Sequence, residues 1–242
     1  MIQSVRATPS LPLALDGLGK STTCDAPVCG TQLLTTTKGH DVIILIVECG
    51  DGSLCNNVST VSDSAGLTFV QRISYSTGDG LGTKLWEYYA IADSPLKSDN
   101  ITVVTDTCKA TVYCIEGMQV VAVNGANTRA VFDRNPSIPA TCAGLDCGVC
   151  GVGVGTCSVS IQTSTIDFVI ASTAINDAPP CGLGYPNGIV PGFTNILNQE
   201  SRFEVDYAIT TTPQSNVTVN CQGTDDIAMV VDAISFYGAF ST

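Results

Sequence analysis

Val42-Ile43-Ile44-Leu45-Ile46-Val47 is the longest apolar run in this chain of 242 residues. Its length is that of a buried strand, and it is far shorter than the roughly 20 apolar residues that a helix needs to cross a bilayer. A second segment, 83–91 (Thr-Lys-Leu-Trp-Glu-Tyr-Tyr-Ala-Ile), is rich in aromatic and β-branched side chains. Both segments predict core strands.

Shorter strand patterns continue along the rest of the chain, and no convincing amphipathic helix interrupts them. They cover residues 67–73, 101–105, 111–123, 157–163, 168–175, 203–211, 216–221 and 227–236. Turn residues, for example at 76–80 and 179–182, separate them. Neither a repeat with a period of 20–50 residues nor a change in composition divides the chain. We therefore expect an all-β fold: one β-sandwich or jelly-roll-like domain over residues 20–242.

The N-terminal segment has a strand pattern of its own. Apolar side chains alternate with polar ones from residue 5 to residue 16, which would span about 40 Å if extended. The alternating apolar residues include Val5, Ala7, Leu11, Leu13 and Leu15. Pro9 and Pro12 cannot donate to a strand ladder, so this strand belongs at an edge or in an inserted position. We expect residues 1–19 to be a donor strand and linker that fills a groove of a neighbouring copy; packing into its own domain, or disorder, is the alternative.

The small share of charged residues and the acidic net charge exclude two classes of binding partner. Charged residues make up 13% of the chain, against a usual share of about 25%. The net charge is −12, and the ten Lys and Arg residues are scattered. Nucleic acids and anionic membrane surfaces need clustered basic residues, so both are excluded as partners. Hydroxyls, amides and sugars must then keep the surface soluble.

Three glycosylation sequons and twelve cysteines indicate an exported protein in an oxidising setting. The sequons begin at Asn57, Asn100 and Asn216, each at the end or the start of a strand candidate, so we expect N-linked glycans there. Residues 1–6 have no signal-peptide pattern, and we therefore expect the numbering to begin at or near a processed end.

Most cysteine spacings are local and predict disulfides that close short loops. The expected short-range pairs are Cys24–Cys29, Cys49–Cys55 and Cys108–Cys114, and Cys181 with Cys221 is left as a long-range pair. Each such bond contributes roughly 2–4 kcal/mol to stability.

The other four cysteines, Cys142, Cys147, Cys150 and Cys157, lie in a Gly-rich segment. The first three have the spacing that begins a plant-type [2Fe–2S] site, and Cys147 with Cys150 could form half of a zinc site. The chain has one histidine, and exported cysteines are usually oxidised. We therefore expect two disulfides in this segment and no metal or other cofactor.

Catalytic patterns are weak. A Ser-His-Asp arrangement would have to use His40, which adjoins Gly39 at the entry to a core strand and is expected in a turn. The acidic candidates are Asp225, Asp226, Glu200 and Glu204, which we expect on solvated turns or strand faces. The sequence therefore does not predict an enzyme.

Five stretches together resemble a β-sandwich domain of secreted bacterial and archaeal surface proteins. They are 41–48, 61–69, 85–92, 101–105 and 229–236. With the N-terminal strand, the sequons and the cysteines, the chain is similar to subunits of archaeal extracellular threads and related pili. The cysteine content is higher than that family pattern requires. The resemblance implies donor-strand complementation between copies of one chain, a place on the cell surface, and a role in adhesion or biofilm.

The alternative function is a secreted adhesin or carbohydrate-binding sandwich that does not polymerise. Sugar-binding faces present exposed Trp or Tyr side chains. Trp86, Tyr88 and Tyr89 lie within one predicted strand, at least one face of which must belong to the core. The exposure of these three residues therefore bears on the choice.

Overall fold

The computed structural model describes residues 12–21, 30–49, 57–76, 84–105, 117–143, 156–175, 192–199, 203–222 and 227–240. Apart from the 3-10 helix Tyr237–Phe240, the regular elements of these residues are strands, so the predicted all-β class is confirmed. In the described parts of the chain, no helix has the length and apolar character needed to span a membrane.

The N-terminal half contains two antiparallel sheets. The inner N-terminal sheet has the order β1 (Ala14–Leu18), β9 (Gly117–Asn124), β4 (Asp41–Cys49), β7 (Lys84–Ala92) and β6 (Val70–Ser76). The outer N-terminal sheet has the order β2 (Lys20–Ser21), β3 (Thr31–Leu34), β8 (Asp99–Thr105) and β5 (Val58–Ser62).

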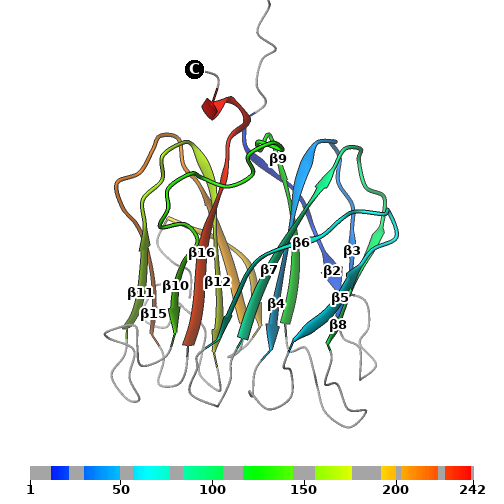
Figure 1. Ribbon diagram of the computed structural model, residues 1–242, viewed down its shortest axis with the longest axis horizontal. Coiled ribbons are helices and arrows are strands. Elements are labelled where there is room, and N and C mark those ends of the chain that lie inside the picture. The colour runs from blue at the N-terminus through cyan, green and yellow to red at the C-terminus, as the bar shows by residue number, and fades with distance from the viewer. Residues whose placement is uncertain are drawn as a thin grey trace, which may run out of the picture.

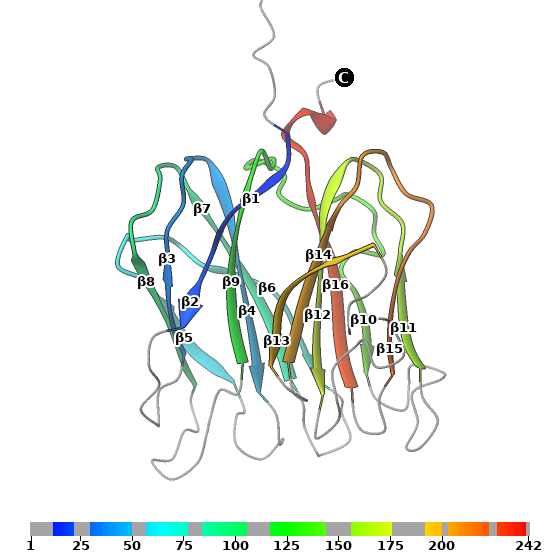
Figure 2. The same ribbon diagram turned by 180° about the vertical axis from the view of Figure 1, so that it is seen from behind.

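The C-terminal half is built in the same way. Its inner sheet has the order β10 (Ala140–Ala143), β16 (Ile227–Ser235), β12 (Asp167–Ile175), β14 (Phe203–Ile209) and β13 (Thr194–Gln199). Its outer sheet is formed by β11 (Thr156–Ile161) and β15 (Val217–Gln222). In Figures 1 and 2 the two halves stand side by side, with the inner sheets facing each other.

The four sheets form four layers, and the apolar run of β4 shows why. Successive side chains of a strand point to opposite faces of its sheet. Ile43, Leu45 and Val47 pack against the outer N-terminal sheet, whereas the alternate residues 42, 44 and 46 pack against the inner C-terminal sheet. A strand that is covered on both faces has to be apolar throughout.

The central strand of the C-terminal half has the same double burial. Val169 and Ala171 of β12 pack toward the outer C-terminal sheet, and Phe168 and Ile170 pack into the core between the inner sheets. The expectation of one sandwich is therefore too simple, because the chain forms two sandwiches that share a central core.

The two halves repeat one topology. The order β1-β9-β4-β7-β6 corresponds position by position to β10-β16-β12-β14-β13. Even a bulge is repeated: the register shifts between Gln71 and Ile73 against β7, and between Asn195 and Leu197 against β14. This duplication spans half of the chain, so a search for periods of 20–50 residues does not reveal it.

The N-terminal strand differs from its prediction. β1 pairs antiparallel with β9 of its own chain, and Leu15 lies opposite Val123. Leu13 is 7% exposed, and both leucines pack into the core between the inner sheets. The prediction that Leu13 and Leu15 fill a neighbour's groove is therefore corrected, because their own sheet provides an apolar edge at β9. Val5, Ala7 and Leu11 lie outside the described residues.

Candidate functional site

One edge of the inner N-terminal sheet is incomplete. Strand β6 pairs with β7 from Ser76 opposite Lys84 as far as Val70 opposite Tyr89. Beyond that point β7 continues through Ala90–Ala92, where it pairs only with β4, on its other side. Within the described chain, the last residues of β7 therefore have no strand beside their outer edge.

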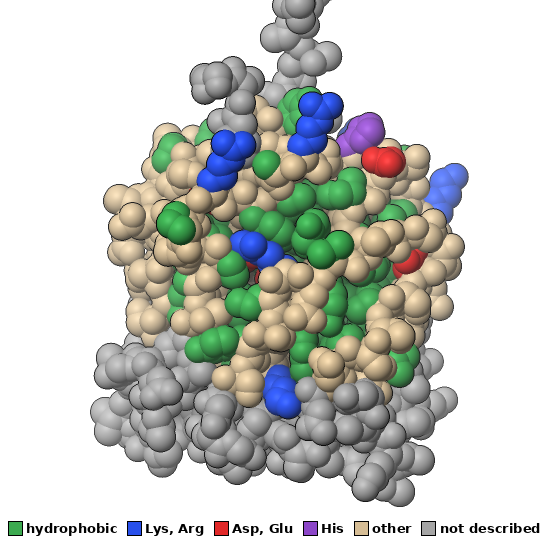
Figure 3. Space-filling model, viewed as in Figure 1, with side chains coloured by type: hydrophobic (Ala, Val, Ile, Leu, Met, Phe, Trp, Pro, Cys, Tyr) green, Lys and Arg blue, Asp and Glu red, His purple; other side chains and the backbone are tan. Residues whose placement is uncertain are grey.

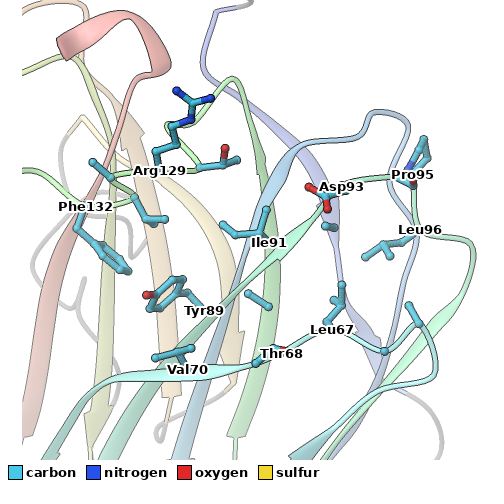
Figure 4. Close-up of a pocket in the computed structure, with 18 residues that line it drawn as sticks. Leu67, Thr68, Val70, Tyr89, Ile91, Asp93, Pro95, Leu96, Arg129 and Phe132 are labelled. Carbon is cyan, nitrogen blue, oxygen red and sulfur yellow. The ribbon is translucent and has the colours of Figure 1, made fainter.

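A groove of about 900 Å³ lies at this edge (Figure 4). Its walls come from the segment before β6, from the end of β7 with the loop that follows, and from residues 128–132. Apolar side chains lining it include Leu67, Val70, Tyr89, Ile91 and Phe132. In Figure 3 hydrophobic side chains gather over the middle of this face. Val70 is 45% exposed, so part of the apolar lining is open to solvent.

Aromatic contacts hold one side of the groove. The rings of Tyr89 and Phe132 meet edge to face, with centroids 5.1 Å apart. The guanidinium carbon of Arg72 lies 4.0 Å from the centre of the Phe132 ring. By contrast, Trp86 and Tyr88 are buried and point to the opposite face of β7, into the N-terminal sandwich. Of the three aromatic residues singled out in the sequence, Tyr89 is the one that lines the groove.

Polar side chains fix the two loops that wall the groove. Asp99 Oδ1 accepts hydrogen bonds from the backbone N–H groups of Ser64 and Ala65, and this fixes the turn that leads to Leu67. On the other wall, Asn127 Oδ1 accepts from the N–H groups of Arg129 (3.0 Å) and Ala130 (3.1 Å). Side chains of the protein itself therefore fix both walls.

The groove carries one charge of each sign among its lining residues, from Asp93 and Arg129. Asp93 is also 3.7 Å from Nδ1 of His40. His40 is exposed at the bend before β4 and has a positive φ of 60°, as expected of a turn residue. In the described part of the chain, no group of three or more His, Cys, Asp or Glu side chains could hold a metal ion.

Chemically, this arrangement can bind an extended segment. An unpaired strand edge offers backbone hydrogen-bonding groups, and the apolar lining can accept alternate side chains of an added strand. Sequence reasoning did not find the groove. The groove exists because β6 begins only at Val70, opposite Tyr89, whereas β7 continues to Ala92.

Glu204 is not solvated, which corrects the expectation for it. Its side chain is buried on β14, beside Asp206, whose Oδ1 accepts a hydrogen bond from Nδ2 of Asn195 (2.9 Å). Burial, the hydrogen bond with Asp206 and the charge of Asp206 raise the pKa of Glu204 to about 10. Two neighbouring carboxyl groups in a dry place share a proton more readily than they both ionise. Glu200, Asp225 and Asp226 lie outside the described residues.

The three sequons lie on the outer sheets. Asn57 directly precedes β5, Asn100 is in β8, and Asn216 directly precedes β15; all three are exposed. The hydroxyl of Thr218 donates a hydrogen bond to Oδ1 of Asn216 (3.2 Å). Glycosylation at these residues stays a prediction.

Among the cysteines, Cys49 at the end of β4 is disulfide-bonded. The backbone register places Cys157 of β11 directly opposite Cys221 of β15. Since Cys181 lies outside the described residues, the expected Cys181–Cys221 bond stays a prediction. Cys142 is in β10. The others lie outside the described residues: Cys24, Cys29, Cys55, Cys108, Cys114, Cys147, Cys150 and Cys181.

Comparisons of the chain with protein-family models, with curated proteins and with solved structures find no match.

Proposed function

We propose that the protein is a structural subunit of an extracellular filament, in which residues 1–11 of one copy add as a strand to the groove of the next copy. The observation that carries the proposal is the missing strand beside Ala90–Ala92, at the edge of an otherwise complete sheet. The partners are then other copies of the same chain.

The N-terminal segment suits this groove. Val5, Ala7 and Leu11 share one face of an extended strand, and the groove offers apolar side chains. Eleven residues reach about 36 Å at roughly 3.3 Å per residue. Arg6 in the tail and Asp93 in the groove carry opposite charges. Pro9 is tolerated because an added edge strand uses only half of its backbone groups.

The N-terminal tail (the donor) and the groove (the acceptor) lie on different surfaces, which favours a polymer over a closed dimer. β1, into which the tail leads, lies at one edge of the inner N-terminal sheet, and the groove lies beside β7 toward the opposite edge. A joint between two different surfaces is head-to-tail, and unless a ring closes it continues as a filament.

The setting of the proposed filament is the cell surface, with adhesion or biofilm as its role. Three exposed sequons on the outer sheets and a disulfide at Cys49 support an exported glycoprotein. None of the three sequon asparagines is among the residues that line the groove.

Deletion of residues 1–11 tests whether the N-terminal tail is required for polymerisation. We expect the full chain to form filaments in negatively stained images and the shortened chain to stay monomeric in light scattering. The shortened chain should still bind a synthetic peptide of residues 1–11. Filaments of normal length from the shortened chain would overturn the proposal.

A substitution in the groove tests the acceptor. Val70→Arg places a charge on an exposed apolar position of the lining, and Val104→Arg, at 40% exposure on the outer sheet, is the matched control. We expect V70R to stop polymerisation and V104R to leave it unchanged. V70R keeps a donor and the shortened chain keeps an acceptor, so their mixture should give heterodimers. Equal behaviour of V70R and V104R would contradict the assignment of the groove.

Carbohydrate binding is the second candidate for the same groove. The half-buried rings of Tyr89 and Phe132, with Arg129 and Asp93 nearby, favour it. A glycan array probed with the shortened chain separates the two functions: Tyr89→Ala should abolish a sugar signal if this is a sugar site, whereas the full chain would stay monomeric.

A further inference from the structure

A cluster of three ionisable side chains joins the two halves of the molecule. Glu87 of β7 and Arg72 of β6 come from the inner N-terminal sheet, and Asp232 of β16 comes from the inner C-terminal sheet. Glu87 is 2% exposed and Asp232 is fully buried. We name Arg72, Glu87 and Asp232 the interlayer cluster.

Arg72 is engaged by Asp232. Its Nε donates to Oδ2 of Asp232 at 2.8 Å, and its Nη2 donates to the carbonyl oxygen of Ile138 at 3.2 Å. Oδ1 of Asp232 also accepts from the N–H of Ala233 at 2.8 Å. Arg72 is the extra residue of the β6 bulge, a feature that commonly redirects a side chain.

Glu87 is left with a carboxyl neighbour. Its buried side chain is close enough to Asp232 to be affected by the negative charge of that residue, and no described donor reaches its Oε1. Two ionised carboxylates repel each other in a dry place, whereas a protonated carboxyl group can donate to a neighbouring carboxylate. Burial and the negative charge of Asp232 raise the pKa of Glu87 well above its ordinary 4.5, and Arg72 lowers it only in part.

Other groups around Glu87 are mostly uncharged. Its partners across the sheet are Ile46 on β4 and Ile73 on β6. Glu48 at the end of β4 is a further titratable side chain on this face of the sheet, but it is not among the groups that shift Glu87. One guanidinium thus faces two carboxyl groups, and a single proton makes the interlayer cluster neutral.

The duplication shows that the fold does not require these charges. By the register of the strands, the C-terminal half places Ile196 at the position of Arg72 and Val205 at that of Glu87. Likewise Val121 of β9 corresponds to Asp232. These three counterparts are apolar and belong to the same central core.

We propose that the interlayer cluster is a proton-dependent latch: Glu87 keeps its proton in the folded protein, and loss of that proton as the pH rises weakens the contact between the two sandwiches. The protein is then most stable in an acidic medium. This inference is independent of filament formation.

The raised pKa of Glu87 determines the direction in which stability changes with pH. A carboxyl group whose pKa is raised on folding supports stability fully below its unfolded pKa, about 4.5 for Glu87. That contribution is lost as the pH rises toward the folded pKa. The protein should therefore unfold more readily at neutral and alkaline pH.

The experiment is thermal unfolding of the full chain at about pH 4 and about pH 8, followed by circular dichroism. We expect the melting temperature of the wild type to fall at the higher pH. Glu87→Gln should recover at least about 3 °C of that fall. Lys97→Gln, which removes an exposed charge outside the groove lining, is the control and should leave the fall unchanged. If E87Q lowers the melting temperature equally at both pH values, Glu87 is ionised in the fold and the latch is wrong.

Two further measurements keep the test decisive. The triple variant Arg72→Ile, Glu87→Val and Asp232→Val copies the apolar counterpart, and we expect it to fold with a smaller dependence on pH. Infrared spectra at about pH 7 should contain a protonated-carboxyl band that shifts when glutamate is labelled with 13C, and Glu204 contributes to this band as well as Glu87. The triple variant keeps Glu204, so we expect its band to be weaker than that of the wild type. An equally strong band in both proteins would overturn the proposal even if E87Q does not fold.

Discussion

Residues that correspond in the two halves do the same structural work although their surroundings in the sequence differ. The hydroxyl of Thr36 donates to the carbonyl oxygen of Lys38 and accepts from the N–H of Leu96. Thr163 repeats both bonds, to the carbonyl oxygen of Thr165 and from the N–H of Gln214, with the same distances of 3.2 and 2.9 Å. In each half a threonine thus ties the loop before the central strand to the turn between two other strands.

A carboxylate completes each of these loops. Asp16 accepts hydrogen bonds from the N–H groups of Thr37 and Lys38. Asp133 does so for Ser164 and Thr165 at 2.7 and 3.1 Å. Although burial raises the pKa of Asp133, the hydrogen bonds outweigh it and lower the pKa, so Asp133 stays ionised.

The first residue of each central strand is an aspartate whose pKa is raised by burial and by this neighbouring carboxylate. Asp41 begins β4 and Asp167 begins β12, and both side chains are fully buried. Burial and the charge of Asp16 raise the pKa of Asp41 to about 6, with Asn124 opposing the shift. Burial and the charge of Asp133 raise the pKa of Asp167 to about 7.

Replacement of Asp167 tests whether its raised pKa makes stability depend on pH. In the wild type, the contribution of Asp167 to the free energy of unfolding is fully present below about pH 3.8 and is lost as the pH rises to about 7. We expect Asp167→Asn to remove this part of the pH dependence, so that its melting temperature approaches or exceeds that of the wild type at about pH 8 but not at about pH 4. If the melting temperatures of the variant and the wild type change equally between about pH 4 and about pH 8, Asp167 does not titrate in this range.

At the scale of elements, β9 and β14 approach each other so closely that one position excludes a side chain. A Cβ at Gly117 of β9 would overlap the ring of Phe203 on β14. Phe203 is fully buried in the core between the inner sheets. The ring cannot move aside without displacing its neighbours in a close-packed interior.

Gly117→Ala should therefore destabilise the fold by about 1–3 kcal/mol. Denaturant unfolding measures the loss. Phe203→Leu in the same chain removes ring atoms from the place of overlap, so we expect the double variant to lose less than the sum of the two single losses. Additive losses would mean that the two strands do not meet at this point.

At the scale of the molecule, the central core is shared by both halves. It combines Val42 and Ile44 of β4 with Phe168 of β12 and Phe203 of β14. Neither half can bury this surface alone, and a large exposed apolar face leads to association or aggregation. The two sandwiches are therefore parts of one cooperative unit.

A chain that ends after residue 126 should consequently fail to fold as a soluble monomer. The full chain should unfold in a single transition, with near- and far-ultraviolet circular dichroism coinciding. Two separate transitions would show that each sandwich is stable by itself.

The sequence by itself determined the all-β class and most strand positions, because alternation and apolar runs act over a few residues. Strands were expected at 168–175, 203–211 and 227–236, and the structure has 167–175, 203–209 and 227–235. The shorter strands were missed, since two to six residues carry little periodic signal; they are β2, β3, β5, β10 and β13.

Only the tertiary structure decided which sheet each face meets. The duplication is hidden because equivalent positions carry unlike residues, such as Glu87 and Val205, and share only a place in the register. The burial of Glu204, the placement of Leu13 in its own core and the open edge of β7 likewise depend on strands far apart along the chain. Local hydrophobic patterns specify that a face is buried, whereas its partner is chosen by the packing of all four layers.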